Sequence, residues 1–313
     1  MEEKVHPDLK AMFSVLPAAP LTPETLEMVR STLNEMTLAN PKQHDAVSTI
    51  DRFIPGPPGN PEVRVRIYEP VSKHEKMPGL LWIHGGGYII GIPEMDDALC
   101  QRFALEAECI VVSVDYRLAP ETPFPGPVED CYAALKWFAE HADELGVDAS
   151  RIAVAGASAG GGLTAAVSLL ARERKGPDIS FQMPLYPMID DRIITKSSHE
   201  ISDERVWNKE KNIHGWSAYL GSSYGGQVSP FAAPARAESL EDLPPTYTCV
   251  GDLDPFRDET LEYVTKLAQA GVPTEFHLYP GCFHGFDMLV PDAGISQHAA
   301  AQYVDAVKRA FQK

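Results

Sequence analysis

The 313-residue chain is poor in basic residues and has no long apolar run. Lysine and arginine total 27 against 44 aspartates and glutamates, which gives a formal net charge of −17 at pH 7. A surface of this sign repels phosphate backbones and anionic lipids, so it excludes nucleic acid and a charged membrane as partners. No stretch of about eighteen apolar residues occurs, and Met1-Glu2-Glu3-Lys4 lacks the pattern of a signal peptide. We therefore expect a cytoplasmic protein.

Cysteine is scarce and unpatterned. The five cysteines include no C-x-x-C pair and are odd in number, which argues against a zinc site or a disulfide framework. We favour a packing role for Cys282 over an oxidation-sensitive one. No metal-ligand cluster, phosphate-binding loop or internal repeat is visible, so we expect no metal and no cofactor.

The order of the predicted elements indicates the fold class. Short apolar runs typical of strands alternate with helical patterns from about Val63 onward. This predicts the α/β class, with a mostly parallel central sheet flanked by helices. We place one such domain at residues 41–313. Residues 1–40 lie outside the alternation, and so does a polar and aromatic insertion at about residues 191–220.

A helix is expected within the N-terminal segment. Thr22 and Pro23 are typical of an N-cap and a first-turn proline. Apolar residues then recur at helical spacing, which predicts a buried face. These residues are Leu26, Val29, Leu33 and Met36.

The most informative segment is Gly156-Ala157-Ser158-Ala159-Gly160, which follows the apolar run 151–155 and opens a helix of small residues. A G-x-S-x-G sequence between a strand and a helix is typical of a sharp turn that exposes the serine hydroxyl. Larger side chains would clash across that turn. Ser158 is therefore the candidate nucleophile, and the alternative is an inert serine in an ordinary turn of small residues.

A glycine-rich loop follows the apolar run 79–83. In His84-Gly85-Gly86-Gly87 the glycines leave backbone N–H groups bare. Donors of this kind stabilise the negative oxygen that develops during acyl transfer. We predict such donors at Gly86, Gly87 and Ala159, where Ala159 also begins the helix after the serine. The alternative is a loop that is merely flexible.

A serine nucleophile needs a base to take its proton and an acid to orient that base. In this type of sequence the chain order is serine, acid, histidine. His284 follows a predicted strand at 274–279 and is the candidate base. His277 lies inside that strand, His84 braces the glycine loop, and His214 falls in the insertion.

The candidate acids follow a predicted strand at 246–250. We favour Asp254, because Pro255 restricts the backbone before it and so helps to fix the carboxylate. Asp252 and Asp258 remain alternatives. Asp258 also has a simpler role as an acid in the first turn of a helix.

Together these motifs resemble the hormone-sensitive-lipase-like esterases of the α/β-hydrolase fold. The matching segments occur in the family's order from about Asp51 to the C-terminus: His84-Gly85-Gly86-Gly87, 115–121, 156–161, 254–259 and His284-Gly285-Phe286. The resemblance implies carboxylic esters with short to medium acyl chains as substrates. It also implies the same roles as the residues themselves suggest: Ser158 as nucleophile, Asp254 as orienting acid, His284 as base, and Gly86, Gly87 and Ala159 as oxyanion donors.

Two positions depart from the family pattern. Ala157 stands before the serine, where an acidic residue is frequent, and Phe256 stands where leucine is frequent. The first change is expected to alter substrate preference or pH response without removing the nucleophile.

In this family, segments outside the sheet cover the nucleophile and exclude water. We therefore expect residues 1–40 and the insertion 191–220 to form a cap. The alternative is that their apolar residues only attach the cap to the core. The candidate pocket residues are Met12, Phe13, Leu16, Trp207 and Trp216.

The predicted reaction is two-step hydrolysis of a small-molecule ester through an acyl-enzyme. Three alternatives stay open: hydrolysis at a lipid surface, amide hydrolysis by the same residues, and a small-molecule receptor on a hydrolase scaffold. A homodimer paired through an exposed final strand is a further expectation. The sequence does not identify the natural ester.

Overall fold

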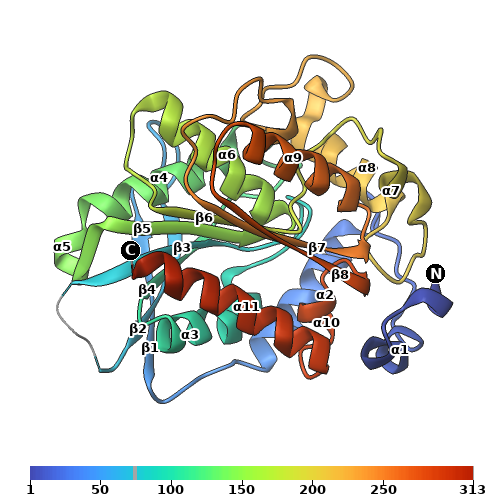
Figure 1. Cartoon of the computed structure of the whole chain (residues 1–313), viewed down its shortest axis with the longest axis horizontal. Helices are drawn as coiled ribbons and strands as arrows, with labels where there is room; N and C mark the ends of the chain where they lie inside the picture. The colour runs from blue at the N-terminus through green and yellow to red at the C-terminus, as the bar shows by residue number, and fades with distance from the viewer. Residues whose placement is uncertain (73–75, 313) are drawn as a thin grey trace.

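An eight-stranded sheet forms the middle layer of the molecule (Figure 1). The computed structural model describes residues 1–72 and 76–312. Across the sheet the strands have the order β1-β2-β4-β3-β5-β6-β7-β8. Their bounds are β1 Val47–Ile54, β2 Val63–Pro70, β3 Met77–Ile83, β4 Ile110–Asp115, β5 Val147–Ala157, β6 Phe181–Leu185, β7 Thr246–Leu253 and β8 Thr274–Phe283.

Most of the sheet is parallel, as the sequence predicts. Strand β2 pairs antiparallel with β1 and β4, and every pair from β4 to β8 is parallel. Strand β3 is buried along its whole length, which explains its continuous apolar sequence, because parallel strands are covered on both faces. The C-terminal ends of the parallel strands meet at one edge, where open α/β sheets bind their ligands.

Helices cover both faces of the sheet (Figure 1). The helices on one face are α3 Asp97–Glu106 and α11 Gly294–Phe311. Those on the other face are α4 Gly126–Glu140, α6 Ala159–Arg174 and α9 Arg257–Gln269. The shorter helices are α1 Pro7–Phe13, α2 Leu26–Ala39, α5 Ala142–Leu145, α7 Lys196–Glu200, α8 Lys209–Leu220 and α10 Phe286–Leu289, with 3-10 turns η1 Glu2–Lys4, η2 Pro93–Asp96, η3 Gly221–Ser223 and η4 Pro234–Arg236.

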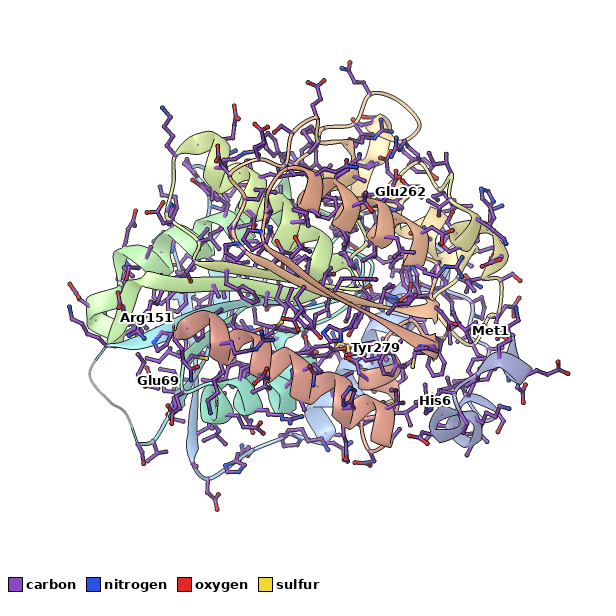
Figure 2. All side chains as sticks on the ribbon, in the orientation of Figure 1. Met1, His6, Glu69, Arg151, Glu262 and Tyr279 are labelled. Carbon is purple, nitrogen blue, oxygen red and sulfur yellow. The ribbon has the colours of Figure 1, made fainter. Side chains whose placement is uncertain are left out.

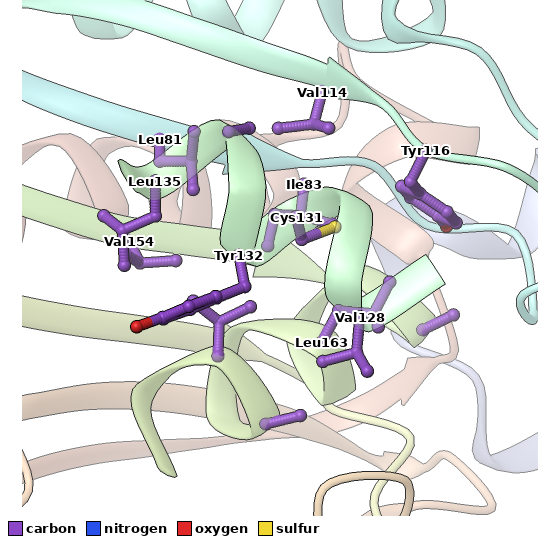
Figure 3. Close-up of a cluster of buried hydrophobic side chains, with 14 of the residues drawn as sticks. Leu81, Ile83, Val114, Tyr116, Val128, Cys131, Tyr132, Leu135, Val154 and Leu163 are labelled. Carbon is purple, nitrogen blue, oxygen red and sulfur yellow. The ribbon is translucent and has the colours of Figure 1, made fainter. Parts of the chain in front are cut away.

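Successive residues of β3 enter opposite cores. Leu81 and Ile83 pack with Leu135 of α4 and Leu163 of α6 (Figure 3), whereas Trp82 packs on the other face against α3. This follows from the two-residue period of a strand. The paired strand β5, which leads to Ser158, alternates between the same two cores, so it is packed on both faces.

The N-terminal segment runs along the edge of the sheet that carries the strand ends. The backbone N–H of His6 donates to the Gly281 carbonyl at 2.8 Å, which ties the segment to the end of β8; Figure 2 shows His6 on that side of the molecule. The structure corrects the start of the helix that follows. Helix α2 begins at Leu26 and not after Thr22, because the Thr25 hydroxyl accepts from the Thr22 N–H at 2.9 Å and closes a turn there. Met36, expected on a buried face, is 62% exposed.

Candidate active site

Ser158 occupies the turn between β5 and α6. Its φ of +58° and ψ of −119° lie in a sparsely populated region, which the packing on both sides must hold in place. A Cβ atom on Gly160 would come within 2.0 Å of the Ile83 carbonyl oxygen, so the first turn of α6 can approach β3 only with glycine there. The turn is therefore sharp, and the serine hydroxyl faces a cavity.

Three side chains from different strand ends meet in one line. The Ser158 hydroxyl and Nε2 of His284 lie 2.8 Å apart, and Nδ1 of His284 lies 2.7 Å from Oδ2 of Asp254. Asp254 follows β7, and His284 follows β8. The Asp254 carboxylate is 1% exposed, and its second oxygen accepts from the Phe256 N–H at 2.8 Å. This arrangement leaves the imidazole one direction in which to accept a proton, toward Ser158.

The competing acids Asp252 and Asp258 and the competing histidine His277 have other partners. Asp252 accepts from the Gly281 N–H at 2.6 Å, and Asp258 accepts from the Ser197 N–H at 2.8 Å. His277 lies 3.0 Å from Glu275 within β8. The geometry therefore places Asp254 beside His284, and it places the other candidate acids elsewhere.

The glycine loop after β3 lies beside Ser158. A Cβ atom on Gly85 would approach the Ser158 Cβ to 3.4 Å, and one on Gly87 would come within 2.1 Å of the Trp207 ring. Within the described residues, the N–H groups of Gly86, Gly87 and Ala159 have no acceptor. Free backbone donors of this kind are what an oxyanion site requires, and Gly86 and Gly87 line the same cavity as Ser158.

His84 holds the loop from behind. Its Nδ1 lies 2.7 Å from the Gly85 carbonyl oxygen, and its ring stacks on Tyr116 with centroids 4.3 Å apart. The Tyr116 hydroxyl also donates to the His84 carbonyl at 3.0 Å. Burial lowers the pKa of His84, so the ring is neutral at neutral pH. Its role is to brace the loop, as the sequence predicts.

A cavity of about 280 Å³ opens above Ser158 and His284. Its wall is mostly apolar and comes from six separate segments of the chain. The residues are Ala19, Leu21, Val29, His84, Gly85, Gly86, Gly87, Ile90, Met95, Asp96, Ser158, Tyr186, Arg205, Val206, Trp207, Lys211, His284, Gly285, Met288 and Leu289.

Only one of the five expected pocket residues, Trp207, belongs to this wall. Phe13 is fully buried against Phe283, because the apolar side of α1 faces the end of β8. Trp216 is also fully buried, with Tyr88 at 5.4 Å between ring centroids, because it points from α8 into the core. Leu16 packs at the edge of the same core as Phe13. Met12 is 43% exposed on α1.

The residues that replace them were not apparent from the sequence. Leu21 and Val29 reach the cavity from the N-terminal segment. Met288 and Leu289 reach it from α10, just after His284, and this closeness along the chain was the one available signal. Asp96 is the one acidic side chain in the described wall of the cavity.

Comparison with known proteins agrees with this geometry. A family model described as the α/β-hydrolase fold matches residues 80–288. Esterase LipI of Mycobacterium tuberculosis is 38% identical over 90% of this chain and 88% of its own length. An arylesterase of Saccharolobus solfataricus is 36% identical over 72% of this chain and 73% of its own length.

Solved structures superpose closely. A structure titled bacterial heroin esterase has a TM-score of 0.95 and 43% identity, covering 99% of both chains. Esterase LipW from Mycobacterium marinum has a TM-score of 0.91 and 34% identity, covering 100% of this chain and 98% of the other.

In the described residues, no helix has the length and apolar character needed to cross a membrane.

Proposed function

The chain belongs to the α/β-hydrolase family and is a carboxylesterase, and we propose that it cleaves small esters with short to medium acyl chains through an acyl-serine intermediate. The observation that carries the proposal is the unbroken chain of hydrogen-bond distances from Ser158 through His284 to Asp254. The mostly apolar cavity of about 280 Å³ above the serine favours acyl chains of this size.

In the first step, Nε2 of His284 takes the proton from Ser158 as Oγ attacks the ester carbonyl carbon. The carbonyl oxygen becomes an oxyanion and accepts hydrogen bonds from the N–H groups of Gly86, Gly87 and Ala159. The tetrahedral intermediate collapses, and His284 returns the proton to the departing alcohol. Asp254 stays ionised and accepts from Nδ1–H throughout, which holds the tautomer that the base needs.

In the second step, a water molecule attacks the acyl carbon and gives a proton to Nε2 of His284. The same N–H donors bind the second oxyanion, and the proton then moves to the Ser158 oxygen as the acid is released. Over the two steps, His284 accepts two protons, one from Ser158 and one from water, and it returns one to the alcohol and one to Ser158. The enzyme therefore ends the cycle unchanged.

We propose that residues 1–40 and the insertion 191–220 together form the cap of this site. Leu21 and Val29 from the first segment and Trp207 and Lys211 from the second line the same cavity. A cover built in this way excludes water from the intermediate and shapes the acyl pocket.

We also propose that two copies pair through β8, which is an edge strand with Leu278 41% exposed. Sedimentation over a range of concentrations tests this, and a monomer throughout that range would contradict it. The cytoplasmic location stays a prediction.

The decisive experiment combines covalent labelling with rates. An organophosphate should label Ser158, as read by mass spectrometry of the digested protein. Ser158→Ala should lower kcat on 4-nitrophenyl esters about a million-fold. The control is Ser222→Ala, an exposed serine, which should keep the wild-type rate. Labelling at another residue, or turnover that survives Ser158→Ala, would refute the assignment.

A further inference from the structure

One carboxylate stands in the otherwise mostly apolar wall of the catalytic cavity. Asp96, the last residue of η2, is 4% exposed and lines the same cavity as Ser158. Its Oδ2 accepts a hydrogen bond from Nε1 of Trp82 at 2.7 Å. Its Oδ1 has no hydrogen-bond partner in the described part of the chain, and it is not among the unpartnered polar atoms that are buried. The second oxygen therefore meets the cavity.

No basic side chain of the described residues forms an ion pair with Asp96. The neighbouring Asp97 has such a partner, because Arg66 lies 3.0 Å from it. Burial raises the pKa of Asp96 to about 7, the Trp82 hydrogen bond opposes this rise, and the nearby Asp287 adds to it. A carboxylate in this position is costly to ionise, and a cation brought in by a ligand would offset that cost.

The two basic residues of the cavity wall are engaged elsewhere. The Arg205 guanidinium pairs with Asp203 at 2.8 Å and lies 4.0 Å over the Phe13 ring. The Lys211 ammonium donates to the carbonyl oxygens of Glu204 and Val206 at 2.7 and 3.0 Å. Both belong to the insertion, whereas Asp96 belongs to the loop that follows β3. The carboxyl group of Asp96 and the two basic groups therefore lie on different walls of the cavity.

We propose that Asp96 is a specificity-determining residue that selects esters carrying a protonated amine, with its free oxygen accepting the hydrogen bond of the ammonium group. This inference rests on the proposed function, because the ester must be cleaved at Ser158. It adds no covalent step. The amine and Asp96 form a charge-assisted hydrogen bond in a largely desolvated site, which is the stronger kind.

The test compares matched esters. One series is dimethylaminoalkyl acetates with linkers of two to four methylenes, and the other replaces the protonated nitrogen by CH. Asp96→Asn keeps an acceptor for Trp82 and removes the charge. Asp45→Asn is the control, because Asp45 is exposed and its loss changes the net charge equally. We expect the ratio of kcat/KM for amine over neutral ester to fall about tenfold or more in Asp96→Asn and to stay constant in Asp45→Asn.

A ratio that Asp96→Asn leaves unchanged at every linker length would overturn the inference while the proposed function stands. If the wild type cleaves neither series, the proposed function fails, and binding still decides the inference. Calorimetry on Ser158→Ala should then show the amine ester binding more tightly than its neutral partner. The double variant Ser158→Ala, Asp96→Asn should lose that difference. If the ratio of affinities for the amine and neutral esters is the same in the single and double variants, the inference is overturned.

Discussion

The orientation and tautomer of the His284 imidazole determine whether it can accept the Ser158 proton. His284 contacts Ser158 through Nε2 and Asp254 through Nδ1. The Phe256 ring packs against the imidazole at a right angle, with 4.9 Å between ring centroids. Packing alone limits the tilt of the ring, but only the carboxylate distinguishes its two tautomers. The function of Asp254 is therefore separable from the structural role of its neighbours.

Asp254→Asn should lower kcat about ten-thousandfold, because an amide in place of the carboxylate favours the wrong imidazole tautomer. The matched control is Asp252→Asn, which keeps an acceptor for the Gly281 N–H and lies outside the hydrogen-bond chain. That control should lose less than about tenfold. Steady-state rates and thermal melts on both variants check this, and equal losses of kcat would contradict the assignment of the acid.

Asp96 should also leave a signature in the pH dependence of stability. Its folded pKa of about 7 exceeds the unfolded value of 3.8, so the native state holds the proton more tightly. Both states are protonated below the unfolded value, and the native state loses stability as pH rises from there to about 7. Asp96→Asn removes this loss, and its gain over wild type should grow with pH to at most about 4 kcal/mol. Denaturant titrations at a series of pH values measure it, and a difference that is constant with pH would contradict the prediction.

The proximity of Ser158, His284 and Asp254 could be predicted at this scale, whereas the lining of the cavity could not. Acyl transfer to a serine needs a base and an acid, and parallel strands deliver all three groups to one edge, so Ser158, Asp254 and His284 follow from motif and order. Which apolar side chains face the serine depends instead on how α1 and α8 are rotated. The sequence shows that Phe13 and Trp216 are apolar but does not show which way each one points.

At the scale of elements, α2 is held to the body by few contacts. Leu26 is the one buried residue in this helix, and Met28, Met36 and Leu38 are exposed. Arg30 supplies the polar attachment: it donates to the carbonyl oxygens of Ile89 at 2.7 Å and Ala119 at 2.6 Å. Ile89 lies two residues after Gly87, so this arginine joins α2 directly to the glycine loop.

Arg30→Ala should loosen α2 while leaving the sheet intact. Two buried carbonyls lose a charged donor, at a local cost of about 1–3 kcal/mol, so amides of α2 should exchange hydrogen faster and KM should rise. The control is Glu121→Gln, which removes only the exposed half of the Arg30–Glu121 pair and should change little. Hydrogen exchange followed by mass spectrometry reads the helix separately from the core, and unchanged exchange in α2 would contradict the role of Arg30.

The extent of burial explains which elements the sequence predicts well. Strands β3 and β4 lie under helices on both faces, so their apolar runs match their structure. Helix α2 has only a narrow buried side, and a hydrogen bond between Thr22 and Thr25 delays its start by a turn. Local side-chain bonds of this kind override an N-cap signal and a proline that would suit the first turn.

At the scale of the whole molecule, the net charge of −17 sets a field around the cavity. Such a field lowers the local concentration of anionic substrates and weakens as salt screens it. Anionic and neutral esters of the same shape should therefore respond differently to ionic strength. 4-Nitrophenyl hemisuccinate and 4-nitrophenyl pentanoate form such a pair.

We expect kcat/KM for the hemisuccinate, relative to the pentanoate, to rise several-fold between about 0.01 M and about 1 M salt, over which the Debye length falls from about 30 Å to about 3 Å. Any preference that remains at high salt belongs to groups inside the cavity, where screening is weak. Asp96→Asn should change that remaining preference and leave the slope with salt nearly as it was, because it removes one charge of a net seventeen. A ratio that is flat across this range would show that substrate selection is entirely local to the cavity.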